Sequence, residues 1–196
     1  MFNRISVFFK TKILRNSQAR WNKQYEDGIW EGLKDQLEAD RQQACRHFIK
    51  QYKLDSDILE VGCGEGIFVG NIIQKDEYRQ YVGADVSDFV IQKTARELTD
   101  NKTTFRQEDM DNFQLKQPFD VIFFNESLNY AKNITETLRY CKTYLSQPDA
   151  IFIISLHNHK HSPKHWAEIH NNLTPFDSKS VKNERAEWCI EVLKAL

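Results

Sequence analysis

The stretch that decides the fold is Glu60-Val61-Gly62-Cys63-Gly64-Glu65-Gly66, which lies between an apolar run at residues 58–61 and a helical pattern at residues 67–75. Three glycines at alternate positions let a chain turn tightly and let its backbone approach a ligand closely. A helix that begins directly after such a loop presents free N–H groups and the positive end of its dipole to that ligand. The stretch therefore predicts a ligand-binding turn between a strand and a helix.

Strand and helix patterns alternate on both sides of this loop. The predicted strands are residues 58–61, 81–86, 103–106, 121–124 and 151–156, and the predicted helices are residues 67–75, 88–99 and 134–145. Residues 181–183 and 188–193 predict a closing hairpin. We therefore expect an α/β domain: a mostly parallel seven-stranded sheet that ends in an antiparallel β-hairpin, with helices on both faces.

A helical segment is predicted ahead of this domain. Apolar side chains within residues 31–52 fall near one stripe, as in a helix that packs on a core. We expect two parts: an N-terminal helical segment at residues 1–53 and the α/β domain at residues 54–196.

Composition is that of an ordinary globular protein. Of the 196 residues, 40% are hydrophobic and 28% are charged, and a net charge of −1 gives no footprint for nucleic acid. No stretch approaches the roughly 20 apolar residues of a membrane span. Residues 1–20 are basic, so weak peripheral contact with lipid stays open beside a solvated helix. Four cysteines without CxxC spacing favour reduced thiols and a cytoplasmic protein.

The glycine loop and its preceding acid resemble motif I of class I S-adenosylmethionine (SAM)-dependent methyltransferases, a family with a Rossmann-like fold. Three later positions agree, because Asp85, Asp109 and Asn125 end the second, third and fourth predicted strands. The resemblance covers roughly residues 55–193. It implies an enzyme that transfers a methyl group, with SAM as cofactor and S-adenosylhomocysteine as product.

Two alternatives stay open. A nicotinamide-binding Rossmann oxidoreductase also carries a glycine loop, but its GxGxxG spacing would place a third glycine where this chain has Ile67. A non-catalytic SAM-binding or interaction protein could keep the fold without the activity.

The resemblance also assigns contacts to the cofactor. It implies that Asp85 accepts hydrogen bonds from both ribose hydroxyls and that Asp109 meets the adenine amino group. The predicted cofactor-binding residues are Glu60, Gly62, Cys63, Gly64, Gly66, Asp85, Val86, Asp109, Met110, Asn125, Trp21, Tyr25 and Trp30. The last three lie in a segment that resembles the lid of many small-molecule methyltransferases, although packing on the core explains such aromatic residues equally well.

The methyl acceptor is expected at the ends of two neighbouring strands, where open α/β sheets bind ligands. We expect Glu126 to act as the general base, His157 to position the acceptor and Tyr130 to orient it. Residues 125–128 read Asn-Glu-Ser-Leu, unlike the Asn/Asp-Pro-Pro-aromatic sequence of methylases that act on base or glutamine amides. We therefore expect methylation on oxygen or nitrogen of a small-molecule or sugar-like acceptor, and no nucleic-acid partner.

Five of the six histidines lie between residues 157 and 170. His161 and His165 have the spacing of a helical metal pair, but Pro163 between them argues against an unbroken helix. We expect a polar loop that faces the acceptor, and no metal.

Overall fold

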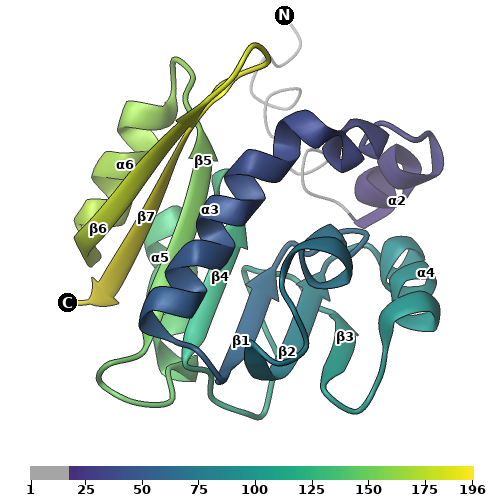
Figure 1. The fold of residues 1–196 in the computed structure, drawn as a ribbon, viewed down its shortest axis with the longest axis horizontal. Helices are drawn as coiled ribbons and strands as arrows, with labels where there is room; N and C mark the ends of the chain where they lie inside the picture. The colour runs from purple at the N-terminus through teal and green to yellow at the C-terminus, as the bar shows by residue number, and fades with distance from the viewer. Residues whose placement is uncertain (1–17) are drawn as a thin grey trace, which may run out of the picture.

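The computed structural model describes residues 18–196, so most of the basic segment at residues 1–20, for which a solvated helix and weak lipid contact are both open, lies outside the described residues (Figure 1). The helices are α2 (Gln18–Glu26), α3 (Gln36–Tyr52), α4 (Asp88–Leu98), α5 (Ile134–Cys141) and α6 (Ser162–His170). The strands are β1 (Ser56–Val61), β2 (Tyr78–Asp85), β3 (Thr103–Gln107), β4 (Val121–Asn125), β5 (Ile151–His157), β6 (Leu173–Lys182) and β7 (Glu187–Ala195). Short 3-10 helices lie at Glu31–Lys34, Leu128–Tyr130 and Lys142–Tyr144, and a π-helical turn lies at Phe68–Ile72.

All the strands belong to one seven-stranded sheet of order β3-β2-β1-β4-β5-β7-β6. Strands β1 to β5 are parallel to one another, and β7 is antiparallel to both β5 and β6. The chain builds outward from β1 to β3 and then returns to β4 on the other side of β1. This reversal between β1 and β4 opens a crevice at the carboxyl ends of the parallel strands, where ligands bind in such sheets. The predicted fold class is confirmed.

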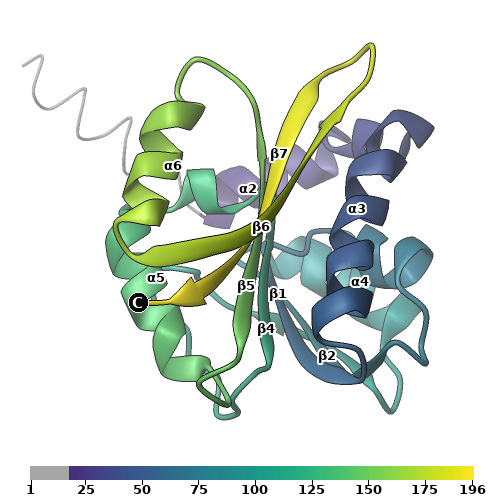
Figure 2. The ribbon, with the colours of Figure 1, turned by 60° about the vertical axis from the view of Figure 1, so that its left-hand side comes forward.

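Helices cover both faces of the sheet (Figure 2). Successive residues of each central strand point to opposite faces, so Ile58 and Phe123 pack in the core under α3 and α4. Their neighbours Leu59 and Ile122 pack in the core under α5 and α6. Both faces are therefore apolar, as the uninterrupted apolar runs predict. None of the helices within residues 18–196 has the length and apolar character that crossing a bilayer requires.

Two elements near the ends of the domain differ from the prediction. The helix predicted at residues 67–75 is only the π-helical turn Phe68–Ile72. The first strand of the predicted hairpin is not residues 181–183 but the whole of β6, which extends over Leu173–Lys182. Most side chains of β6 are exposed because it is the edge strand of the sheet. It therefore lacks the apolar alternation on which the prediction depends.

One predicted helix boundary and one predicted loop also differ from the structure. Residues 31–34 form a 3-10 helix, and α3 begins only at Gln36. The segment predicted as a histidine-rich loop is helical from Ser162, because Pro163 lies in the first turn of α6. A proline there loses no hydrogen bond, since the first N–H groups of a helix have no partner within it.

Candidate active site

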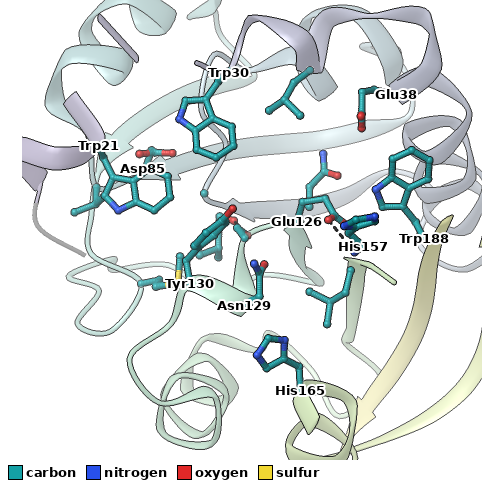
Figure 3. Close-up of a pocket in the computed structure, with 18 of the residues that line it drawn as sticks. Trp21, Trp30, Glu38, Asp85, Glu126, Asn129, Tyr130, His157, His165 and Trp188 are labelled. Carbon is teal, nitrogen blue, oxygen red and sulfur yellow. Dashed lines mark hydrogen bonds between the residues drawn. The ribbon is translucent and has the colours of Figure 1, made fainter. Parts of the chain in front are cut away.

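The loops that follow the parallel strands meet at one edge of the sheet and border a cavity of about 420 Å³. Most of the predicted site residues line it: Trp21, Tyr25, Trp30, Gly62, Asp85, Val86, Asp109, Met110, Asn125, Glu126, Tyr130 and His157. Figure 3 shows Trp21 and Asp85 at one end of this space, and Glu126, His157 and Trp188 at the other. Residues predicted to bind the cofactor and residues predicted to act on the acceptor therefore share one cavity.

The glycine loop turns back onto β2 directly after β1. Gly62 and Gly64 have φ values of +77° and +52°, in a region that is unfavourable for residues with a side chain. A Cβ atom at Gly62 would overlap that of Ser127, and one at Gly64 would lie 2.8 Å from the Tyr25 hydroxyl oxygen. Backbone conformation and space both exclude side chains here, so this loop can lie directly against a ligand.

Asp85 is a buried carboxylate at the end of β2, only 6% exposed. It accepts hydrogen bonds from the backbone N–H of Gly64 at 3.0 Å and of Ser87 at 2.9 Å. The Tyr25 hydroxyl donates to the same carboxylate at 3.3 Å, which ties α2 to the end of β2. Burial raises the pKa of Asp85, and these donors oppose the shift. Asp85 therefore holds the glycine loop in place besides lining the cavity.

Asp109 and Met110 follow β3 and line the cavity, as does Val86 after β2. One oxygen of Asp109 accepts the N–H of Asp111 at 3.0 Å. The other lies 3.3 Å from the Lys132 ammonium. The sequence prediction missed Lys132, which comes from the loop before α5 and forms ion pairs with Asp109 and Asp111.

The predicted cofactor residues Glu60, Cys63, Gly64 and Gly66 do not line the cavity but lie behind its wall. Glu60 is 2% exposed and accepts hydrogen bonds from the Tyr81 hydroxyl and, at 3.2 Å, from the Asn125 amide nitrogen. Burial raises the pKa of Glu60 to about 7 and raises that of the Cys63 thiol well above its usual range. A side chain at Gly66 would collide with Thr94 of α4. These four residues therefore shape and hold the loop, and other residues form the surface of the cavity.

Glu126 is the first residue after β4 and lies at the same end of the cavity as His157 and Trp188 (Figure 3). Its backbone has φ of +64°, which is unusual for a residue with a side chain. Its carboxylate accepts hydrogen bonds from the Ser155 hydroxyl and the His157 backbone N–H, both at 2.8 Å. Burial raises the pKa of Glu126 to about 7, and the charge of Arg41 opposes this shift. The result is a carboxylate able to exchange a proton near neutral pH.

The rings of Trp21, Trp30 and Tyr130 pack against one another and line the cavity. Trp21 of α2 stacks on Trp30 with 5.7 Å between ring centroids, and Tyr130 meets Trp21 edge-on at 5.0 Å. The Asn22 side chain fastens α2 to the start of α4, because it donates to Asp88 and accepts from the Ser87 hydroxyl, both at 2.7 Å. The aromatic residues of the predicted lid therefore line the cavity and are not merely part of a separate core.

Several cavity residues escaped the prediction. They are Leu33, Glu38, Val61, Glu108, Asp111, Ser127, Asn129, Leu156, Arg185, Ala186 and Trp188. Glu38 had a usable signal, because it shares a helical stripe with Cys45 and yet is charged. Trp188 was assigned only to a strand face, and its place at the cavity follows from the antiparallel pairing of β7 with β5, opposite His157.

Within residues 18–196, no three His, Cys, Asp or Glu side chains come together as a metal site would require. His159 and His165 line the cavity instead, and their rings are 6.0 Å apart.

The residues present fit SAM as a ligand. The cavity joins a side-chain-free loop at Gly62 to the carboxylates of Asp85 and Asp109. Three side chains that line it also hold buried polar atoms without a hydrogen-bond partner: Trp30 Nε1, Asn129 Oδ1 and His165 Nδ1. Buried polar atoms are normally paired, so unpaired atoms beside a cavity are consistent with a polar ligand there.

Comparison with known proteins places the chain in a family. Residues 52–193 match the model of a methyltransferase domain family, and the chain belongs to this family.

Curated relatives are more distant. The chain is 25% identical over 128 residues to malonyl-[acyl-carrier protein] O-methyltransferase of Bacillus cereus, which covers 65% of the chain and 46% of that protein. It is 29% identical over 96 residues to tRNA (guanine-N(7)-)-methyltransferase of Clostridium acetobutylicum, covering 48% and 42%. The chain thus matches less than half the length of each of these relatives.

Solved structures share the fold. The N-methyltransferase NodS of Bradyrhizobium japonicum, in complex with S-adenosylhomocysteine, has a TM-score of 0.67 at 16% identity and covers 85% of this chain and 91% of its own. The 1,6-didemethyltoxoflavin-N1-methyltransferase of Burkholderia thailandensis has a TM-score of 0.71 at 14% identity, covering 100% and 92%.

Proposed function

We propose that this protein is a SAM-dependent methyltransferase that acts on an oxygen or nitrogen of a small-molecule or sugar-like acceptor. The observation that carries the proposal is the single cavity that joins the glycine loop and Asp85 to Glu126 and His157. When bound, SAM supplies an electrophilic methyl group on a sulfonium sulfur. Family membership and the fit of the cavity support SAM over a nicotinamide cofactor, whose third loop glycine is replaced by Ile67.

The roles of the residues follow from their places. Asp85, Asp109 and Met110 hold the cofactor at one end, while Gly62 gives it room at the backbone. The protein's main contribution is alignment of the two reacting groups, which can lower a barrier by roughly 7–11 kcal/mol. Trp21, Trp30 and Tyr25 exclude water by covering the cavity.

Glu126 is the proposed general base. With a pKa of about 7, it is half ionised near neutral pH and can take a proton from a hydroxyl or an ammonium group. His157 and Tyr130 would position the acceptor, and the backbone N–H of His157 donates to the Glu126 carboxylate.

All four cysteines are unpaired thiols, which supports the cytoplasmic location that the sequence predicts.

A ligand screen by thermal unfolding tests the cofactor. S-Adenosylhomocysteine at 100 times its dissociation constant should add about 2.7 kcal/mol to the free energy of unfolding. Stabilisation by NAD or NADH alone would replace the proposal with an oxidoreductase. Stabilisation by S-adenosylhomocysteine without any methyl transfer would indicate a non-catalytic binding protein.

The acceptor class needs a separate experiment. SAM labelled in its methyl group, the enzyme and a cell extract divided by ultrafiltration into small molecules and macromolecules should yield a labelled small molecule that is distinct from SAM by chromatography. Label that stays with RNA or protein would instead favour a macromolecular acceptor, as named for the curated relatives.

A further inference from the structure

The buried face of α3 changes character along the helix. Cys45, Phe48 and Ile49 near its middle and C-terminal end pack in the apolar core against the sheet. Near its N-terminal end, the same side of the helix carries Glu38 and Arg41, which are 6% and 2% exposed. A buried charge is costly unless it is paired. The helix therefore carries two buried charges at the end that faces the cavity, and the groups that Arg41 contacts indicate its role.

Arg41 contacts groups from three elements. Its guanidinium donates to one Glu38 oxygen from Nε at 3.3 Å and from Nη2 at 3.1 Å. Its remaining nitrogen Nη1 donates to the amide oxygen of Asn125 at the end of β4. The guanidinium carbon also lies 5.8 Å from the ring centroid of Trp188 on β7. Arg41 therefore connects α3, β4 and β7 directly behind the cavity wall that Asn125, Glu38 and Trp188 form.

The bond to Asn125 fixes which way its amide points. An amide has one accepting and one donating end, and Arg41 offers only donors. With its oxygen on Arg41, Asn125 must turn its nitrogen toward Glu60, to which it donates at 3.2 Å. A flipped amide would place an oxygen against the Glu60 carboxylate. The guanidinium thus sets the hydrogen bonding of a residue that it does not touch.

Arg41 is also the cation whose charge favours the ionised forms of both buried carboxylates, Glu60 and Glu126. The other groups around Glu126 are the Glu38 carboxylate on α3, which opposes ionisation, and the Ser155 hydroxyl and His157 N–H of β5, which favour it. Around Glu60, the Tyr81 hydroxyl and Asn125 amide favour ionisation. The Asp85 carboxylate at the end of β2 opposes ionisation of Glu60.

We propose that Arg41 is a positioning residue of this site: it fixes the side chain of Asn125 and supplies the positive charge that balances Glu60 and Glu126, without touching either substrate. The placement of Arg41 holds for the free protein. Its consequence for methyl transfer rests on the proposed function.

The test is a carboxyl titration by NMR with carbon-13 in the glutamate side chains, in which Glu126→Gln identifies the Glu126 signal. In Arg41→Gln, which keeps a hydrogen-bond donor but loses the charge, the Glu126 midpoint should rise by about one pH unit. Arg41→Lys restores the charge and should bring the midpoint back toward the wild-type value. The control is Arg46→Gln on the same helix, because Arg46 pairs with Glu77 away from the cavity and its loss should leave the Glu126 midpoint unchanged.

A folded Arg41→Gln protein with a wild-type Glu126 midpoint overturns the inference. If Arg41→Gln does not fold, the inference is tested by hydrogen exchange in the Arg41→Lys protein. An ammonium cannot reproduce the planar fork, so the side-chain amide protons of Asn125 should exchange with solvent at least about tenfold faster. Unchanged exchange would equally overturn it. No cofactor or acceptor enters these measurements, so their outcome is separate from that of the ligand screen.

Discussion

Two features of its position are unfavourable for Glu126: the backbone conformation and the burial of its charge. Its backbone has φ of +64°, and such a conformation costs of order 1–3 kcal/mol. Burial then raises its pKa to about 7, so its charged form is disfavoured as well. Glycine would remove the first cost and glutamine the second. The surrounding bonds from Ser155 and His157 hold it in position despite both.

Replacing Glu126 with Gln should lower turnover by roughly 10²–10⁴-fold while cofactor affinity stays nearly unchanged. Because only the ionised carboxylate accepts a proton, wild-type turnover should rise with pH through about 7, and this rise should be absent in the variant. Steady-state rates between pH 5 and 9, once an acceptor is found, provide the check. Near-normal turnover in Glu126→Gln with a comparable loss in His157→Ala would assign the base to His157.

The same substitution should change stability in a pH-dependent way. A carboxyl whose pKa is raised in the folded state stabilises the protein while it stays protonated, and this contribution disappears as the pH rises from about 4.5 through 7. Glu126→Gln should therefore be more stable than wild type by about 1–3 kcal/mol at pH 8 and equally stable near pH 4.5. Urea unfolding at the two pH values measures this. An equal difference at both values would show that the charge of Glu126 is not the cause.

The sequence identifies some of these residues and not others for a physical reason. Asp85 and Glu126 are predictable because they follow apolar runs, and parallel strands end at a common edge. Arg41 comes from a helix, and its approach to Asn125 depends on how α3 crosses the sheet. Trp188 depends on the pairing of β7 with β5. Neither the contact between Arg41 and Asn125 nor the pairing of β7 with β5 can be inferred from a local sequence pattern.

At the scale of single elements, the Asn22 side chain is one of the groups that hold α2 beside the cavity. Asn22→Ala removes both side-chain bonds to the start of α4, each worth about 0.5–1.5 kcal/mol. We expect S-adenosylhomocysteine to dissociate roughly 5- to 100-fold faster from this variant, measured by surface plasmon resonance. The control is Lys23→Ala on the same helix, which removes an exposed ion pair with Asp27 just after the end of α2. Equal dissociation from both variants would mean that α2 does not cover the ligand.

The glycine loop makes an equally direct prediction. A methyl group at Gly64 would press on the Tyr25 hydroxyl, and φ of +52° is unfavourable for alanine by about 1–2 kcal/mol. Gly64→Ala should weaken binding of S-adenosylhomocysteine at least about tenfold. Gly32→Ala is the matched control, since a Cβ there meets nothing within 4 Å. If a folded Gly64→Ala protein binds the ligand as wild type does, this loop is not the cofactor site.

Prediction of whole elements succeeds where packing and pattern agree. The central strands are apolar on both faces, so β1, β4 and β5 stand out in the sequence. The edge strand β6 does not stand out, because its exposed side chains show no alternation of apolar and polar residues. The π-helical turn at Phe68–Ile72 does not stand out either, because a single turn is too short to show a helical repeat of apolar residues.

For the whole molecule, the sheet order decides where the chemistry lies. The reversal between β1 and β4 directs the loops after β1 and β2 to one side of the crevice and those after β4 and β5 to the other. In the proposed function, the first set of loops binds the cofactor and the second set meets the acceptor, and both sets line the same cavity. This division is what lets one face of the cavity be tested without disturbing the other.

The most direct test is calorimetric titration of SAM into the wild type, Asp85→Asn and Asp100→Asn. Asp100 is the matched control, because like Asp85 it accepts hydrogen bonds from two backbone N–H groups, but it does not line the cavity. We predict one site in the wild type, binding about 10- to 150-fold weaker in Asp85→Asn, and no change in Asp100→Asn. A wild-type protein that takes up no SAM, or a folded Asp85→Asn protein that binds it with wild-type affinity, would contradict the assignment of this cavity.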